Sequence, residues 1–219
     1  LFSVSPWASP SPITIAPFAS IAEFSAPVSA PGVSLAFTIS TEQTKTATSA
    51  KLVATNTLNT RTGTWAHITR TFGTLLDLRS NAALAFWVYG DGKGEILDFQ
   101  PSCSHTYSTD VSEHYVHVDF FGWKYFEIPL AERDSEEWAK YSWPASHGNW
   151  QSIYINSPDW QHIGFFDIWM NNLPSGNSTC TVFISEVRAL PIVKPMLTNP
   201  TVTIGGKTLS MTNVTLDSG

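Results

Sequence analysis

The sequence predicts an all-β protein, built as a mostly antiparallel β-sandwich or jelly roll. Short runs in which apolar and polar residues alternate recur along the chain, and clusters of turn residues separate them. Only 14% of the 219 residues are charged, compared with about 25% in an average globular protein. Ser, Thr, Asn and Gln supply the polarity instead, which favours strands and turns over solvated helices.

The first 32 residues are dense in proline and rich in Ser and Ala. Because proline is excluded from helix interiors and from central strands, this density predicts an extended linker or edge segment over residues 1–32. We therefore place the start of the sandwich at Val33 and expect one domain over residues 33–191.

Ten runs in that domain have the alternation, or the β-branched and aromatic content, of strands. They are Val33–Ile39, Lys51–Thr57, His67–Phe72, Leu84–Tyr89, Glu95–Gln100, His114–Phe120, Lys124–Leu130, Ser152–Ile155, Ile163–Met170 and Thr181–Ala189. Turn signals separate them, including Gly-Asp-Gly-Lys-Gly at 90–94. A short charged stretch at 130–140 is the one helix-like segment.

The composition changes after Leu190, where three prolines punctuate the chain. The stretch Thr201–Leu209 contains a Gly-Gly pair between two apolar runs, which predicts a hairpin. Residues 192–219 are therefore interpreted as a linker and the start of a further β unit, and the chain as a fragment of a modular protein.

Charge excludes some classes of partner. The formal net charge is −6 and there are only 12 Lys and Arg residues, whereas a ligand held through phosphates needs a basic surface. Neither nucleic acid nor a strongly anionic polysaccharide is therefore expected. No apolar stretch approaches the roughly 20 residues of a transmembrane helix, so no membrane partner is expected either.

The cysteines and the sequence motifs give no catalytic or metal centre. Cys103 and Cys180 lack the spacing of a zinc site, and one disulfide or two buried free thiols are both compatible with the sequence. The chain has no GxSxG, HExxH or Walker motif, and the glycines at 90–94 lie between strands rather than before a helix. His114 and His117 point to opposite faces of one predicted strand. Catalysis is therefore not expected.

Successive side chains of a strand point to opposite faces of the sheet. In three of the predicted strands, the face turned away from the core carries aromatic and acidic residues together. This holds for the runs 114–120, 124–130 and 163–170. Aromatic rings stack on sugar C–H faces, and carboxylates accept hydrogen bonds from sugar hydroxyls. The candidate carbohydrate-binding residues on these faces are Tyr115, His117, Asp119, Asp167 and Trp169. Alternatively, the N-terminal segment or a neighbouring domain covers these faces.

The long connection from Glu132 to Trp160 is a second candidate region, because it is rich in tryptophan and tyrosine without the periodicity of a core. Trp138, Tyr141, Trp143 and Trp150 are its candidate stacking residues. Trp87, in contrast, lies in an apolar strand and is expected to belong to the core.

Two segments resemble a known group of proteins. The run from Leu84 to Leu97, with Phe-Trp-Val-Tyr-Gly-Asp-Gly-Lys-Gly inside it, resembles a hairpin of galactose-binding-like β-sandwich modules. The run from Phe121 to Leu130, with Gly-Trp-Lys-Tyr-Phe-Glu-Ile-Pro-Leu, and the closing strand at 182–188 are similar to other strands of these modules. Many such modules bind carbohydrate and are appended to secreted glycoside hydrolases and polysaccharide lyases.

The resemblance has three implications. The chain is expected to be a secreted, extracellular module that is covalently linked to a catalytic domain. Related jelly rolls often hold a structural calcium ion through acids in the first and last strands, and Glu23 and Glu186 are the nearest equivalents here. The resulting hypothesis is a non-catalytic carbohydrate-binding module for a neutral plant or algal polysaccharide. The alternatives are a structural accessory sandwich without sugar binding and a jelly-roll glycosidase or lyase.

Overall fold

The computed structural model describes residues 11–104, 110–130, 150–154, 158–193, 196–197, 201–204, 207–210 and 214–215. Its strands are β1 (Ile13–Ala16), β2 (Val28–Ser29), β3 (Val33–Ser40), β4 (Ser49–Asn56), β5 (Trp65–Leu76), β6 (Asn81–Asp91), β7 (Glu95–Ser102), β8 (Ser112–Val118), β9 (Phe121–Pro129), β10 (Trp150–Tyr154), β11 (Ile163–Asn171), β12 (Ser178–Pro191), β13 (Met196–Leu197), β14 (Thr201–Ile204), β15 (Lys207–Ser210) and β16 (Val214–Thr215). A short 3-10 helix, η1, covers Ile21–Glu23. Each of the ten predicted strands is present, with bounds that differ by a few residues.

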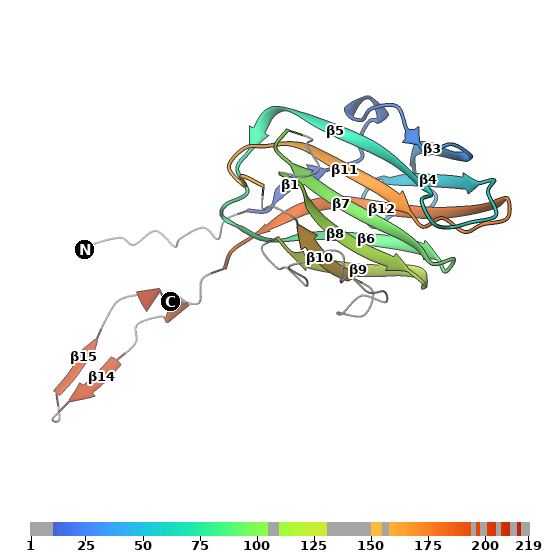
Figure 1. Ribbon diagram of the computed structural model, residues 1–219. Coiled ribbons are helices and arrows are strands. Elements are labelled where there is room, and N and C mark those ends of the chain that lie inside the picture. Colours follow the sequence, from blue (N-terminus) through green and yellow to red (C-terminus); the bar gives the residue numbers. More distant parts are fainter. Residues whose placement is uncertain are drawn as a thin grey trace.

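The strands form two six-stranded antiparallel sheets that pack on each other as a sandwich (Figure 1). One sheet has the order β3-β4-β12-β6-β9, with β1 also paired to β12, and is called the β12 sheet below. The other has the order β10-β8-β7-β11-β5-β2 and is called the β7 sheet. The predicted class, an antiparallel β-sandwich, is confirmed.

The core fills the space between the two sheets with the inward residues of each strand. Phe86 of β6 lies 4.1 Å from Phe99 of β7, measured between ring centroids, and Phe99 lies 6.3 Å from Phe166 of β11. All three rings are buried. A fully buried side chain of this kind contributes about 1.5–3 kcal/mol to stability. The inward set predicted from the period of two, such as Val116 and Val118 in β8, is confirmed.

The sandwich begins earlier than the predicted boundary at Val33. Strand β1 pairs with β12, with Thr14 opposite Arg188, and both Ile15 and Phe18 are buried in the core. The boundary at residue 33 was therefore wrong, because the stretch Ile13–Ala16 lies between two prolines and contains none itself. A short proline-flanked strand fits the free side of β12 beyond the end of β4.

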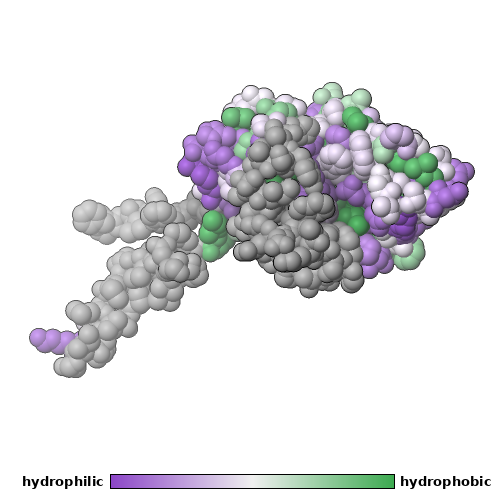
Figure 2. Space-filling view, viewed as in Figure 1, coloured by the Kyte–Doolittle hydropathy of each residue, from purple (hydrophilic) through white to green (hydrophobic). Residues whose placement is uncertain are grey.

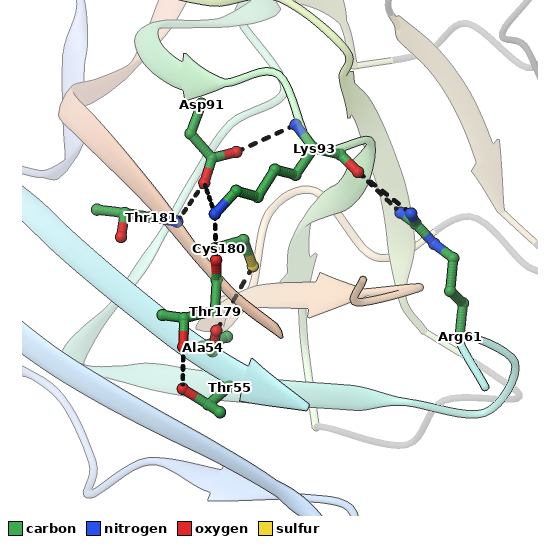
Figure 3. Close-up of polar contacts among 8 residues, drawn as sticks. All are labelled: Ala54, Thr55, Arg61, Asp91, Lys93, Thr179, Cys180 and Thr181. Carbon is green, nitrogen blue, oxygen red and sulfur yellow. Dashed lines mark hydrogen bonds and ion pairs between the residues drawn. The ribbon is translucent and has the colours of Figure 1, made fainter. Parts of the chain in front are cut away.

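The hairpin between β6 and β7 is held by side chains at its turn (Figure 3). Gly92 has φ +73°, a backbone conformation that L side chains rarely adopt. Asp91 accepts hydrogen bonds from the backbone N–H groups of Lys93, at 3.2 Å, and Thr181 of β12, at 2.7 Å. The Arg61 guanidinium donates to the Lys93 carbonyl at 3.2 Å. These contacts make the Gly-Asp-Gly-Lys-Gly segment a structural turn, as the sequence predicts.

Both cysteines are free thiols. Cys180 is buried in β12, where its Sγ lies 3.7 Å from the Ala54 carbonyl oxygen. Cys103 follows β7 in the other sheet, and its Sγ lies 3.3 Å from the Asp159 carbonyl oxygen. The two thiols thus have separate partners and form no disulfide, although only Cys180 is buried and Cys103 is partly exposed, so the alternative of two buried free thiols holds in part.

After Pro191 the described residues form two small pairs of strands. Strand β14 pairs with β15, so the hairpin predicted around the Gly-Gly pair is confirmed. Strand β13 pairs with β16. Whether this region opens a further β unit stays a prediction.

On the face of the molecule that Figure 2 displays, hydrophobic and hydrophilic residues are interspersed.

Candidate functional site

The candidate site lies on the face of the β7 sheet that is turned away from the core. The strand registers place Tyr115 of β8 opposite Asp98 of β7, Asp98 opposite Trp169 of β11, and Trp169 opposite His67 of β5. Directly opposed residues in a sheet point to the same face. Four neighbouring strands therefore present two aromatic rings, an imidazole and a carboxyl group in a single row.

The β11 and β5 end of this row is an aromatic cluster. The rings of His67 and Trp169 are stacked, with centroids 4.0 Å apart and an interplanar angle of 14°. The Trp65 ring lies 5.3 Å from Trp169 and 5.9 Å from His67. All three side chains are partly exposed. Among the residues that the structure describes, the buried Trp169 Nε1–H has no hydrogen-bond partner.

The β8 and β7 end of the row contains buried carboxyl groups. Gln100 donates from its Nε2 to Asp98 at 2.5 Å and to Glu113 at 3.2 Å, and the His114 backbone N–H donates to Asp98 Oδ1 at 3.1 Å. Asp98 is 1% exposed and Glu113 4% exposed. Burial, followed by the charge of Glu113, raises the pKa of Asp98.

A third carboxyl group, Asp167, joins the two ends. It lies opposite Gln100 on one side and Thr69 on the other, and its Oδ1 is 4.0 Å from the Nδ1 of His67. Its side chain is 1% exposed. The arrangement combines rings that can stack on a sugar with carboxyl oxygens that can accept hydroxyl hydrogen bonds.

The outward candidates on β8 and β11 are found on this face. Tyr115 and Trp169 lie in the central row, Asp167 lies in the next row, and His117 lies opposite Ile96 in the row on the other side. Asp119 follows the end of β8, and its Oδ2 lies 3.9 Å from His117 Nδ1. The structure thus brings Tyr115, Asp167 and Trp169 together, with β7 between the two strands that carry them.

The candidates in the long connection are placed only in part. Trp138, Tyr141 and Trp143 lie outside the described residues. Trp150 is the first residue of β10, and its backbone lies opposite Val116 of β8. The connection therefore leads into the strand at the edge of the β7 sheet.

The sequence reasoning did not single out Trp65, His67, Asp98, Gln100 or Glu113 as site residues. The sequence does indicate that these residues face outward. Alternation puts Asp98 and Gln100 on the outer face of one strand, and Trp65 and His67 on the outer face of another. What could not be predicted was that β7 pairs with both β8 and β11. That pairing turns residues distant in sequence into neighbours.

One expectation about outward residues is confirmed and one was wrong. The run 124–130 turns Tyr125 and Glu127 away from the core, as predicted, but β9 belongs to the β12 sheet, so these residues lie on the opposite side of the sandwich from the candidate site. Trp87 was expected in the core, yet it lies opposite Tyr125 and points away from the core, because its neighbour Phe86 takes the inward position.

The two glutamates considered for calcium have other partners. Glu23 forms an ion pair with Arg70 at 3.0 Å. Glu186 accepts a hydrogen bond from Thr14 Oγ1 at 3.3 Å and lies 3.8 Å from Arg188 Nε. Calcium needs six to eight oxygen ligands, and no group of three or more possible ligand side chains is found in the part of the chain that the structure describes. These residues do not fit a calcium site, and a calcium ion held elsewhere stays an untested expectation.

The fold belongs to a recognisable class: it is the β-sandwich fold of carbohydrate-binding modules. The chain is similar to the family 11 carbohydrate-binding module of a cellulosomal cellulase of Clostridium thermocellum, with a TM-score of 0.58 and 14% identity, covering 84% of this chain and 97% of the module. The Clostridium thermocellum family 11 module in complex with a β-1,3-1,4-mixed-linked tetrasaccharide matches with a TM-score of 0.56 and 14% identity, covering 82% and 95%.

A similar fold also occurs within an agarase. That match has a TM-score of 0.51 and 8% identity, and it covers 84% of this chain but 25% of the agarase. No protein-family model matches the sequence, and no curated protein matches it significantly. At these identities the likeness establishes the fold.

Proposed function

We propose that this chain is a non-catalytic carbohydrate-binding module that recognises a neutral plant or algal polysaccharide through the outer face of the β7 sheet. The observation that carries the proposal is the row in which Tyr115, Trp169 and His67 lie beside the buried Asp98. Stacking on the rings would orient a sugar, while the carboxyl groups beside them are the hydrogen-bond acceptors for its hydroxyls.

The charge of this face favours a neutral sugar. Three carboxyl groups, Asp98, Glu113 and Asp167, lie within it. A polysaccharide with its own carboxylates or sulfates would bring further negative charge beside these acidic groups, which is unfavourable in a buried site. Hydroxyl groups instead satisfy carboxyl oxygens that are removed from water.

A covalently linked catalytic domain and a secreted location are part of the proposal. The agarase supports it, since a fold like this one occupies about a quarter of that enzyme. In such an arrangement the module would hold the enzyme on its polysaccharide. Within the described residues, no helix has the length and apolar composition needed to cross a membrane.

Affinity electrophoresis against neutral polysaccharides, including mixed-linked β-glucan and agarose, tests the proposal. We expect at least one of them to retard the protein. In the Trp169→Ala variant we expect a loss of about 2 kcal/mol or more in binding free energy, measured by calorimetry, because a stacking surface is removed. His67→Ala should weaken binding in the same direction.

The control is Leu75→Ala, which truncates an exposed residue on the same strand as His67 but away from the row. It should bind as the unmodified protein does. Thermal melts of each variant separate lost contacts from lost folding. If the protein binds no polysaccharide, or if folded Trp169→Ala and His67→Ala variants both bind normally, the proposed face is wrong and a structural accessory domain becomes the better interpretation.

A further inference from the structure

The outer face of the other sheet carries a second set of aromatic residues. In the β12 sheet, Trp87 lies opposite Tyr125, Tyr89 lies opposite Trp123, and Asp91 lies opposite Phe121. The ring centroids are 5.0 Å apart for Trp87 and Tyr125 and 5.5 Å apart for Tyr89 and Trp123. We call the outward residues of β6 and β9, Trp87, Tyr89, Phe121, Trp123 and Tyr125, the β9 platform.

Core packing does not explain the β9 platform. None of its members belongs to the buried core, which takes Phe86 and Phe126 from the same two strands. Phe121 is 83% exposed and Tyr125 37% exposed. The other three rings are partly exposed. The outer face of an antiparallel sheet is usually polar, so a row of exposed and partly exposed rings indicates a surface that meets a ligand or partner.

The Lys45 ammonium group is positioned over two of these rings. The Lys45 Nζ lies 4.6 Å from the centroid of Trp87 and 5.7 Å from that of Trp123. Its loop is fixed across the sheet by Thr46, whose Oγ1 lies 3.0 Å from the Ser185 Oγ of β12, and Ser185 is the direct neighbour of Trp87. The position of Lys45 above the platform is therefore built into the fold.

Lys45 differs from Lys51 in whether a carboxylate is paired with its ammonium group. Lys51 lies 5.4 Å from the Phe183 ring but is paired with Glu42 at 2.7 Å. Among the described residues, Lys45 contacts aromatic rings and has no carboxylate partner. Glu127 of β9, on the same face, accepts a hydrogen bond from the Tyr125 hydroxyl at 2.8 Å. Within the described part of the chain, the Lys45 ammonium group is thus held by rings rather than by a carboxylate.

From this geometry we propose that the β9 platform is a second carbohydrate-binding surface, specific for a sugar unit that carries a carboxylate, a hexuronate. Phe121, Trp123 and Tyr125 alternate along one edge strand, and alternate residues of a strand are about 7 Å apart. An extended glycan lying along β9 would stack on Phe121 and Tyr125. A carboxylate at its centre would pair with Lys45 above Trp123.

This surface is independent of the one proposed above. The two lie on opposite sheets of the sandwich, and their chemistry differs, because the β7 sheet offers buried carboxyl groups whereas the β9 platform offers the Lys45 ammonium group above Trp87, with Glu127 bonded to Tyr125 further along the strand. A neutral sugar on one side and an acidic sugar on the other would let one module bridge two components of a plant or algal cell wall.

Calorimetry with trigalacturonate at low ionic strength tests the inference on the full chain. We expect binding that high salt weakens, and binding that is lost with the methyl-esterified trisaccharide, which has the same rings but no charge. Lys45→Met keeps the apolar stem and should weaken binding at least about tenfold. Lys45→Arg should restore most of it, and Tyr125→Ala should weaken it by a similar factor.

Lys51→Met is the matched control, since it removes a lysine that also lies over a ring but already has a carboxylate partner. It should bind trigalacturonate as the unmodified protein does. Melting temperatures confirm that each variant is folded. No binding of trigalacturonate, equal binding of its methyl ester, or equal losses in the Lys45→Met and Lys51→Met variants would each overturn the inference.

Discussion

At the scale of single residues, the least expected group is Glu95 at the start of β7. Its side chain is fully buried. Burial, together with the nearby charge of Asp91, raises the pKa of Glu95 to about 8. Burial disfavours the charged form of a carboxyl group, and a second carboxylate nearby disfavours it further. Glu95 is therefore expected to be neutral in the folded protein at pH 7.

This state makes stability depend on pH. Below about pH 4.5, the ordinary pKa, Glu95 is protonated in both the folded and unfolded states. Between that pH and about 8 only the unfolded state releases the proton, so the free energy of unfolding falls as pH rises, by up to about 1.4 kcal/mol per pH unit. Above about 8 both states are ionised and this dependence ends.

We predict that Glu95→Gln removes this dependence. The free energy of unfolding of the variant minus that of the unmodified protein should increase from pH 5 to pH 8. Urea denaturation at several pH values measures both. Asp98, whose pKa is also raised, is present in both proteins and cancels in the difference. Glu42→Gln serves as the control, because Glu42 is exposed and paired with Lys51. Parallel pH profiles for the Glu95→Gln variant and the unmodified protein would contradict the assignment.

At the scale of elements, β1 shows how a segment with the composition of a linker becomes part of a sandwich. Its four residues pair with the end of β12 and put Ile15 and Ala16 into the core. The Ile15 carbonyl accepts a hydrogen bond from Arg70, which also forms the ion pair with Glu23. The N-terminal strand and η1 are thereby attached to β5, in the opposite sheet.

We predict that Ile15→Ala destabilises the fold by about 2–5 kcal/mol, because it leaves a cavity between the two sheets. Ile21→Ala is a matched control, since Ile21 is 53% exposed, and such a surface change costs less than about 0.5 kcal/mol. Urea denaturation at constant pH measures both. Equal stabilities of the two variants would mean that β1 is dispensable.

At the scale of the whole molecule, the sandwich has two outer faces of different chemistry. The β7 sheet carries aromatic rings with buried carboxyl groups, and the β12 sheet carries exposed rings with Lys45. The core between the two sheets separates them. Residues on strands are held in place by the ladders beneath them, which is what the proposed binding function requires.

We therefore predict that the purified chain releases no reducing or unsaturated ends from any polysaccharide that it binds. The sequence lacks the familiar hydrolase motifs, and the buried Asp98 and Glu113 share one donor, Gln100. A reducing-end assay and absorbance of unsaturated products check this, with an active glycosidase as the positive control. Steady product release that disappears in an Asp98→Asn variant would overturn it.

Alternation within a strand was determined by the sequence alone. The pleat sends successive side chains to opposite faces, so Val116 and Val118 had to face the core together, and Tyr115 and His117 had to face away. The hairpin at 90–94 and the ten strands followed from equally local preferences. These features depend on residues that are close together in the chain, so the sequence is sufficient to predict them.

Only the tertiary structure decided which strands are neighbours. Strand β7 separates β8 from β11 and completes the row with Asp98, whereas β9 pairs with β6 in the other sheet and takes Tyr125 to the opposite side. Strand β1 likewise finds its partner in β12, far along the chain. Such pairings depend on the packing of the whole core and on the geometry of long connections. Local residue patterns do not predict these pairings. The candidate site could therefore be assembled only once the pairing of β7 with β8 and β11 was known.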